Sequence, residues 1–325
     1  MANNLTLSLD RLNDMQPLQI VKDEAVKQRF ILIYSKIWTR GDEKEAEAVY
    51  EHESIAFTRA LSESADLQSC TNFSIFSSFI DLAVCGLSIQ QGSCPQCYLL
   101  KRSVKIGETT GSNGKKCGKY ESRVNLTVSG YGELVMRERC GQIRHADNPV
   151  IVYANDEFSF TDKGGRKQVD YTCHLPHDGQ RIVACFMRIT RADGSIDYAV
   201  MLPEDWGRLA RYSARQNSYY KDGQRVEGNP NSLYSSNGGT IDTGFLKAKC
   251  IKHAFKTYPK VKIGGFTIME ADTTEEDDFY SLSEGTTVDP DTGEVHGQPE
   301  AAPQPFGDNE PPQGVTISTD EEEGF

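Results

Sequence analysis

The chain has 325 residues, of which 38% are hydrophobic, and it carries a formal net charge of −12 at pH 7. No run of about 18 apolar residues is present, which excludes a transmembrane helix. The N-terminus is polar and lacks the charged-then-apolar pattern of a signal peptide. We therefore expect a cytoplasmic protein whose nine cysteines stay reduced.

The charge is distributed unevenly along the chain. Residues 271–325 hold sixteen acidic side chains and no Lys or Arg, which leaves residues 1–270 with a net charge of +4. Within that body, residues 101–145 carry a net charge of +6 and residues 206–263 a net charge of +8. Basic segments on an acidic protein are typical of a surface that binds polyanions, although a solvated protein face gives the same pattern.

The first quarter of the chain has the apolar spacing of helices. We expect one helix over residues 21–38, a second from the N-cap Asp42 to about Ser64, and a third over residues 72–85 that ends at Gly86. The apolar residues expected to be buried by the third helix are Phe73, Phe76, Phe79, Ile80 and Val84.

After Gly86 the pattern changes to that of strands. Strands are expected at 87–91, 97–106, 122–128, 149–154, 157–161, 181–190 and 196–202, with 107–119 as a long hairpin loop. Helices are expected at 131–139, 203–213 and 243–258, and a loop of about thirty residues precedes the last of them. The chain loses its apolar periodicity from about residue 271, which predicts disorder.

The last helix has one basic and one apolar side. On a helical wheel Lys249, Lys252, Lys256 and Lys260 share an arc of about 80°, and Lys247 projects toward the apolar side. The apolar side consists of Cys250, Ile251, Ala254, Phe255 and Tyr258. Such a stripe could follow a phosphate backbone, and a solvated surface helix is the alternative.

Aromatic and basic residues alternate in the segment before that helix. Tyr212, Tyr219 and Tyr220 could stack on bases, at roughly 1–3 kcal/mol per base, or simply pack in a core. The basic residues among them are Arg208, Arg211, Arg215, Lys221 and Arg225.

Motifs for metal or nucleotide chemistry are weak. Cys94 and Cys97 lack a second ligand pair at the spacing of a zinc site, and the CHLPH segment at 173–177 is weaker still. The Gly-rich segment 107–117 has the wrong spacing for a phosphate-binding loop, and no nuclease or hydrolase motif is present. We therefore expect no cofactor, no metal and no enzymatic activity.

Six sequence blocks, taken in their order and spacing, carry a resemblance to a known family. They read IDLAVCGLSI (80–89), CYLL (97–100), SGYGELVMRERCGQI (129–143), NDEFSF (155–160), ACFMRITRADGSIDYAVM (184–201) and LKAKCIKHAFKTYPK (246–260). Together they resemble the RecT family of phage and prophage single-strand annealing recombinases over roughly residues 70–262.

The resemblance implies an α+β fold with a β-sheet that carries helices on one side, distantly similar to the core of eukaryotic strand-annealing mediators. The expected organisation is an N-terminal helical region (1–69), an annealing core (70–262) and a disordered acidic C-terminal tail (263–325). The implied activity is ATP-independent binding of single-stranded DNA in a basic groove and its pairing with a complementary strand. The resemblance also implies self-association into rings or filaments.

The candidate DNA contacts combine the matched blocks with the basic segments. Arg139, Lys247, Lys252 and Lys256 come from the matched blocks, and His253 stands where relatives tend to carry a basic residue. The full set is Lys101, Arg102, Arg137, Arg139, Arg208, Arg211, Arg215, Lys221, Arg225, Lys247, Lys249, Lys252 and Lys256.

The tail and the basic faces allow other partners. The last six residues, 320–325, are similar to the acidic, Phe-terminated tip of bacterial single-stranded DNA-binding proteins, so the tail could occupy the same partner pockets or compete with DNA. A partner exonuclease and the host single-stranded DNA-binding protein are further candidates. The alternative functions are an oligomeric adaptor whose basic faces bind acidic protein segments, and a zinc-dependent nucleic-acid enzyme built on Cys94 and Cys97.

Overall fold

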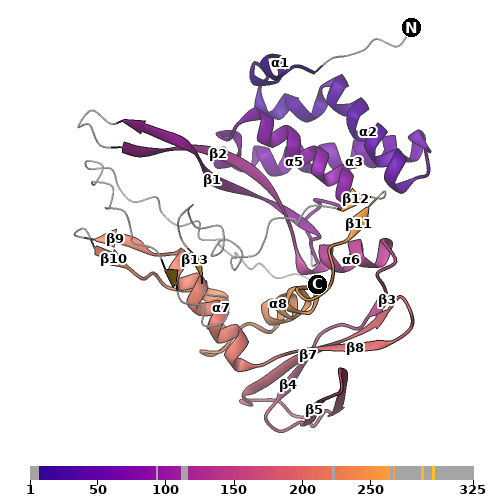
Figure 1. The fold of residues 1–325 in the computed structure, drawn as a ribbon, viewed down its shortest axis with the longest axis vertical. Coiled ribbons are helices and arrows are strands. Elements are labelled where there is room, and N and C mark those ends of the chain that lie inside the picture. Colours follow the sequence, from indigo (N-terminus) through magenta and orange to yellow (C-terminus); the bar gives the residue numbers. More distant parts are fainter. Residues whose placement is uncertain are drawn as a thin grey trace, which may run out of the picture.

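A computed structural model describes residues 7–92, 94–110, 116–221 and 224–263, together with three two-residue strands further along. It contains a cluster of N-terminal helices, a long β-hairpin, and a sheet with helices on one side (Figure 1). This is the expected α+β class. Most of the segment expected to be a disordered tail, 263–325, lies outside the described residues. No helix in the described part of the chain is both long and apolar enough to cross a membrane.

The N-terminal helices pack around three fully buried phenylalanines, Phe30, Phe57 and Phe79. Their rings touch, with centroids 4.8 Å apart for Phe30 and Phe79 and 5.1 Å apart for Phe57 and Phe79. The elements are α1 (Leu9–Asn13), η1 (Pro17–Lys22), α2 (Glu24–Trp38), α3 (Glu43–Ser62), α4 (Ala65–Gln68) and α5 (Asn72–Cys85).

Local signals fix the ends of these helices. The Asp42 side chain accepts hydrogen bonds from the first backbone N–H groups of α3, and Gly86 ends α5 with a φ of 64°. Both caps were expected. Phe73 was expected to be buried, but its side chain is 51% exposed, because it lies across α5 from the stripe that contains Ile75 and Phe79.

The long hairpin joins β1 (Cys97–Thr110) to β2 (Lys116–Val128), so both strands extend into the 107–119 segment that was expected to be a loop. Val124 and Leu126 point from β2 into the N-terminal core. The strand expected at 87–91 is absent. Its backbone is held by side chains instead, as the Ile89 N–H donates to a Glu53 carboxylate oxygen at 2.9 Å.

The sheet is antiparallel and is centred on β7 (Ile182–Arg191). One edge of β7 pairs first with β4 (Val150–Tyr153) and then with β3 (Ile143–Ala146), and the other edge pairs with β8 (Ile196–Met201). A second hairpin, β5 (Glu157–Lys163) with β6 (Arg166–Thr172), leaves the end of β4. The strands β3 and β6 were not expected from the sequence.

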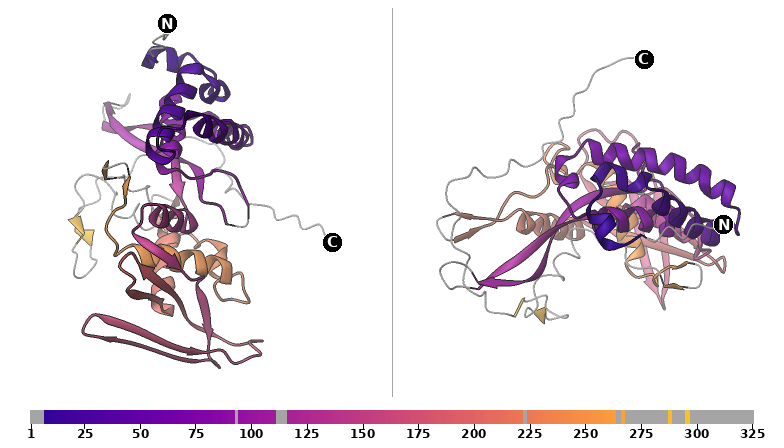
Figure 2. Two further views of the ribbon diagram at one scale, coloured as in Figure 1. Left: turned by 90° about the vertical axis from the view of Figure 1, so that its right-hand side faces the viewer. Right: turned by 90° about the horizontal axis from the view of Figure 1, so that it is seen from above.

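Three helices that follow the long hairpin complete the fold: α6 (Gly130–Arg139), α7 (Pro203–Gln216) and α8 (Thr243–Phe255). In Figures 1 and 2, α7 and α8 lie on one side of the sheet. The helix α6 packs on α8, and Gly130 permits the approach, since a Cβ there would lie 2.7 Å from the Ala248 carbonyl oxygen.

The segment between α7 and α8 is not the structureless loop that its composition suggests. It contains β9 (Tyr219–Lys221), β10 (Gln224–Val226) and η2 (Ser232–Tyr234). The remaining short strands are β11 (Lys262–Ile263), β12 (Phe266–Thr267), β13 (Thr287–Val288) and β14 (Val295–His296).

Candidate nucleic-acid interface

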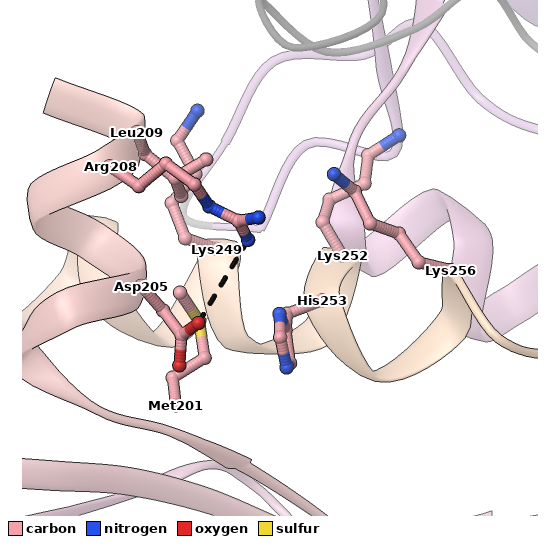
Figure 3. A pocket seen from close by; sticks show the side chains of 8 residues that line it. All are labelled: Met201, Asp205, Arg208, Leu209, Lys249, Lys252, His253 and Lys256. Carbon is pink, nitrogen blue, oxygen red and sulfur yellow. Dashed lines mark ion pairs between the residues drawn. The ribbon is translucent and has the colours of Figure 1, made fainter. Parts of the chain in front are cut away.

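A basic pocket lies where α7 approaches α8 (Figure 3). Four of its lining side chains are cationic, Arg208 from α7 and three lysines from α8 and its end. Asp205 is the one carboxylate among the lining residues. The lining residues are Met201, Asp205, Arg208, Leu209, Lys249, Lys252, His253 and Lys256.

The apolar sides of the two helices position these cations. Leu209 of α7 and Cys250 of α8 are buried in one hydrophobic core with the sheet, so the opposite sides of both helices face away from it. At the start of α7, the Asp205 carboxylate accepts a hydrogen bond from the Leu202 N–H at 2.9 Å. This cap places the acid one turn before Arg208, within the pocket.

The lysines of α8 differ in their surroundings. The Lys249 ammonium lies 4.9 Å from the centre of the Phe245 ring, and the Lys252 ammonium lies 4.0 Å from a Glu133 carboxylate oxygen. The Lys252 side chain is only 16% exposed, whereas Lys256 is exposed. The helix ends at Phe255, so Lys260 lies beyond it and the basic stripe is shorter than expected.

His253 is a neutral member of the pocket at pH 7. Burial lowers the pKa of its imidazole below the usual value, and the positive charges of Lys256 and Arg208 add to this effect while Asp205 opposes it. An anion bound beside His253 would favour the protonated ring, so this side chain can become a further cation when a phosphate is present.

Arg137 has a structural role. Its guanidinium is buried, pairs with Glu133 at 3.1 Å, and donates to the carbonyl oxygens of Phe255 and Pro259 and to the side chain of Gln142. These contacts join α6 to the end of α8. The expectation of a DNA contact does not fit this burial, because a phosphate could reach Arg137 only after these bonds break.

Two other candidates lie outside the pocket and are held by protein groups. Arg139 donates to the Gly86 carbonyl oxygen, and its guanidinium carbon lies 5.8 Å from the centre of the Trp38 ring. Lys101 on β1 pairs with Asp66 at 2.8 Å, and both side chains remain partly exposed. Their neighbours belong to the N-terminal helices.

The remaining candidates extend from the pocket or lie on other elements. Arg211 and Arg215 are exposed on α7, and because they follow Arg208 at intervals of three and four residues, all three lie on the same side of the helix. Lys221 is exposed in β9, Arg225 lies in β10, Lys247 is half-buried on α8, and Arg102 is half-buried on β1. Tyr212 packs against the core of the sheet, whereas Tyr219 and Tyr220 lie in β9.

Asp205 was not expected to be part of the site. The signal was present in the sequence, since an acid at the third position of a helix that begins with Pro203 is a typical capping residue and lies one turn from Arg208.

Cys97, a candidate zinc ligand, is fully buried and donates to the Ser88 carbonyl oxygen at 3.2 Å. In the described part of the chain, Asp156, Cys173 and His177 form the only group of three or more possible metal ligands whose ligand atoms lie close together.

Comparison with known families decides the identity of the chain. The model of the RecT family matches residues 42–230, more than half of the chain. The chain belongs to the RecT family. No curated protein and no solved structure matches it.

Members of the RecT family bind single-stranded DNA and anneal complementary strands in recombination. The matched segment begins at the start of α3, so α1, η1 and α2 lie before it, and it ends between α7 and α8. It therefore contains Arg208 and the rest of α7, while the lysines of α8 lie after it.

Proposed function

We propose that this RecT-family protein anneals complementary DNA strands without ATP, in the cytoplasm of a bacterial host and as an oligomer. The basic pocket between α7 and α8 forms part of the surface that holds the first strand. The observation that carries this proposal is the convergence of four cations from two helices, with a single carboxylate among the residues that line the pocket, in a member of this family.

The chemistry of the pocket suits annealing. Contacts from lysine and arginine to phosphates fix a strand without reading its sequence, which leaves the base edges free to pair with a second strand. Base pairing then supplies the specificity. A paired product presents more phosphates than one strand, so a surface of this kind favours the product.

The proposed contact surface is centred on α7 and α8. Its members are Arg208, Arg211, Arg215, Lys221, Lys247, Lys249, Lys252 and Lys256, with Lys101, Arg102, Arg139 and Arg225 as outlying candidates. Arg137 is left out because it is buried. A partner exonuclease and the host single-stranded DNA-binding protein remain proposed partners. The annealing core over 70–262 remains a proposed domain.

Annealing of two complementary fluorescent oligonucleotides, without ATP or added metal, tests the proposal across a salt series. The full chain should accelerate pairing, and the acceleration should fade as salt rises. The double variant Lys249→Ala/Lys256→Ala should bind single strands more weakly whatever their sequence. Its salt dependence should be shallower by about 0.7 log units for each phosphate that the variant no longer neutralises.

A matched control removes two charges elsewhere. Lys163 and Arg166 are exposed at the tip of the β5–β6 hairpin, so Lys163→Ala/Arg166→Ala changes the net charge equally without touching the pocket. Equal effects of the two double variants would mean that only net charge matters. No acceleration and no binding by the full chain would favour the adaptor alternative, in which basic faces bind acidic protein segments.

A further inference from the structure

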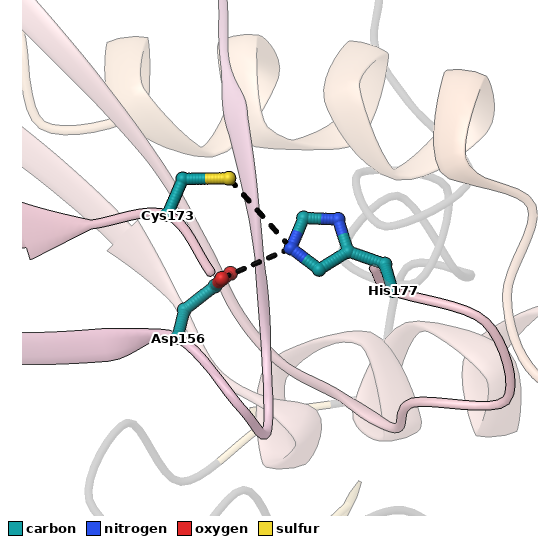
Figure 4. A group of neighbouring side chains, drawn as sticks. All are labelled: Asp156, Cys173 and His177. Carbon is teal, nitrogen blue, oxygen red and sulfur yellow. Dashed lines mark hydrogen bonds and ion pairs between the residues drawn. The ribbon is translucent and has the colours of Figure 1, made fainter. Parts of the chain in front are cut away.

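Three side chains with metal-binding atoms meet at the base of the β5–β6 hairpin (Figure 4). Asp156 lies in the turn before β5, Cys173 follows β6 directly, and His177 comes four residues later. The His177 Nε2 atom lies 2.9 Å from the Asp156 Oδ1 atom and 3.8 Å from the Cys173 Sγ atom. All three donor atoms lie within 4.8 Å of one another.

Backbone contacts hold two of these groups in place before any ligand arrives. The Asp156 carboxylate accepts the N–H groups of Tyr153 at 2.9 Å and of His174 at 2.8 Å. Asn155 donates to the carbonyl oxygens of His174 and of Pro176, which ties the 173–177 segment to the turn. The His177 ring stacks on Tyr153, with centroids 4.1 Å apart.

The direction of these contacts distinguishes a metal site from a nucleophile. In a cysteine–histidine–aspartate catalytic triad, the thiol and the carboxylate bond to opposite nitrogens of the imidazole. Here both address the same Nε2 atom, so the imidazole cannot relay a proton between them. Nitrogen, sulfur and carboxylate oxygen instead converge on one point, as ligands of a single ion do.

We propose that Asp156, Cys173 and His177 bind a zinc ion through Oδ1, Sγ and Nε2. These are the atoms that zinc prefers, at distances of about 2.0–2.3 Å, which in tetrahedral geometry separates neighbouring ligand atoms by about 3.3–3.6 Å. The two separations from Nε2, 2.9 Å to Oδ1 and 3.8 Å to Sγ, bracket that range, and Oδ1 and Sγ lie within 4.8 Å of one another, so small side-chain movements would bring all three atoms to one ion. Cys173 is exposed, which leaves the fourth position open to water.

Binding has a defined proton balance. The Cys173 thiol gives its proton to the buffer, and the His177 imidazole carries its remaining proton on Nδ1, so that Sγ and Nε2 each offer an electron pair to the ion. Tyr171 supports the site from outside, because its hydroxyl donates to the second Asp156 carboxylate oxygen at 3.3 Å. The ion would fix the β5–β6 hairpin against the end of β4, away from the α7–α8 pocket.

The metal content of the full-length protein tests this proposal. After dialysis against zinc and then against metal-free buffer, we expect about one zinc per chain, and cobalt substitution should give a thiolate charge-transfer band. Cys173→Ala and His177→Gln should each lose both the zinc and the cobalt charge-transfer band. Asp156 is left intact because two backbone N–H groups depend on it.

Matched controls come from the same chain. Cys94 is also an exposed thiol, and His145 also pairs with an aspartate, Asp147, at 2.9 Å. Neither belongs to a ligand cluster within the described residues, so Cys94→Ala and His145→Gln should keep the zinc.

Tyr171→Phe removes the hydrogen bond to Asp156 but keeps all three metal ligands, so it should lower zinc affinity roughly tenfold. Zinc retained by Cys173→Ala, or lost in Cys94→Ala, would overturn the proposal. So would a wild-type chain that keeps no zinc. None of these results depends on strand annealing.

Discussion

Arg137 and Arg139 lie two residues apart on α6, but their side chains have different surroundings. Arg137 is 6% exposed and pairs with Glu133, whereas Arg139 is exposed at the end of the helix. From the sequence alone, both were expected to contact DNA. The difference arises because α6 packs on α8 with the Arg137 side, and composition does not reveal which side of a short helix is covered.

Replacement of Arg137 should therefore weaken the fold. Arg137→Ala removes the buried ion pair to Glu133 and the hydrogen bonds to the carbonyl oxygens of Phe255 and Pro259, at a cost of about 3 kcal/mol in the free energy of unfolding. Urea titration followed by circular dichroism measures it. Arg211→Ala, on the exposed side of α7, serves as the control and should leave the urea midpoint unchanged.

If DNA binds at the basic pocket as proposed, His253 should make the binding depend on pH. Burial lowers its pKa in the free protein, with Lys256, Arg208 and Lys167 adding to this and Asp205 opposing it. A bound phosphate favours the charged ring and raises that pKa. The complex then holds a proton that the free protein lacks, so affinity should rise as the pH falls through the window between the two pKa values.

Fluorescence anisotropy with single-stranded DNA at constant salt measures this effect. One proton limits the gain to about tenfold in affinity per pH unit. His253→Gln should remove the rise and leave affinity at high pH close to that of the wild type. A rise of equal size in the variant would assign the proton to another group.

At the element scale, helices were predictable and strands were less so. The helix caps Asp42 and Gly86 are local signals that need no knowledge of the rest of the fold, and both lie where the sequence places them. The length of the β1–β2 hairpin was underestimated. Its outer half is exposed and is held by backbone pairing and surface ion pairs such as Lys105 with Glu108, so no apolar alternation is required.

The candidate site was predictable only in part. The basic side of α8 could be predicted, because helical periodicity is a local signal in the sequence. The partner helix α7, which supplies Arg208 and Asp205 to the pocket, was expected as a helix, but its contact with α8 depends on the sheet beneath both. The strands β3 and β6 were not predicted because one is very short and the other is largely polar.

We expect the β1–β2 hairpin to contribute to the proposed self-association. Tyr98 and Leu100 alternate along one face of β1 and are 38% and 40% exposed, and Ile106, at the β-bulge further along the strand, is 41% exposed. Figures 1 and 2 show the outer part of the hairpin extending from the body. Leu100→Asp should lower the assembled mass measured by light scattering. Ile55→Asp, at an exposed residue of α3, should not. The reverse result would move the contact to the N-terminal helices.

At the scale of the whole molecule, α6 connects two hydrophobic cores. Met136 is buried in the core of the N-terminal helices and the long hairpin, while Tyr131 and Leu134 pack against the core of the sheet, α7 and α8. Arg137 adds its contacts to the end of α8 from the same helix. The proposed DNA-binding pocket and the hairpin proposed for self-association therefore belong to parts of the chain that α6 joins.

The charge of the tail bears on the whole protein. Residues 1–270 carry a net charge of +4, and the sixteen acids that follow bring the chain to −12. A tethered polyanion competes with DNA for basic side chains, and salt screens that competition. Deletion of residues 271–325 should therefore tighten single-strand binding at low salt and have little effect at high salt, as measured by anisotropy.

A shorter deletion separates two roles of the tail. Removal of 320–325 takes away only four of the sixteen acids together with the terminal Phe325. If the tail acts by charge, this deletion should give a small part of the full effect on DNA affinity. If residues 320–325 instead bind a pocket on a partner protein, the deletion should leave DNA affinity unchanged and abolish binding of that protein. Unchanged affinity after the full deletion would mean that the tail does not compete for the basic surface.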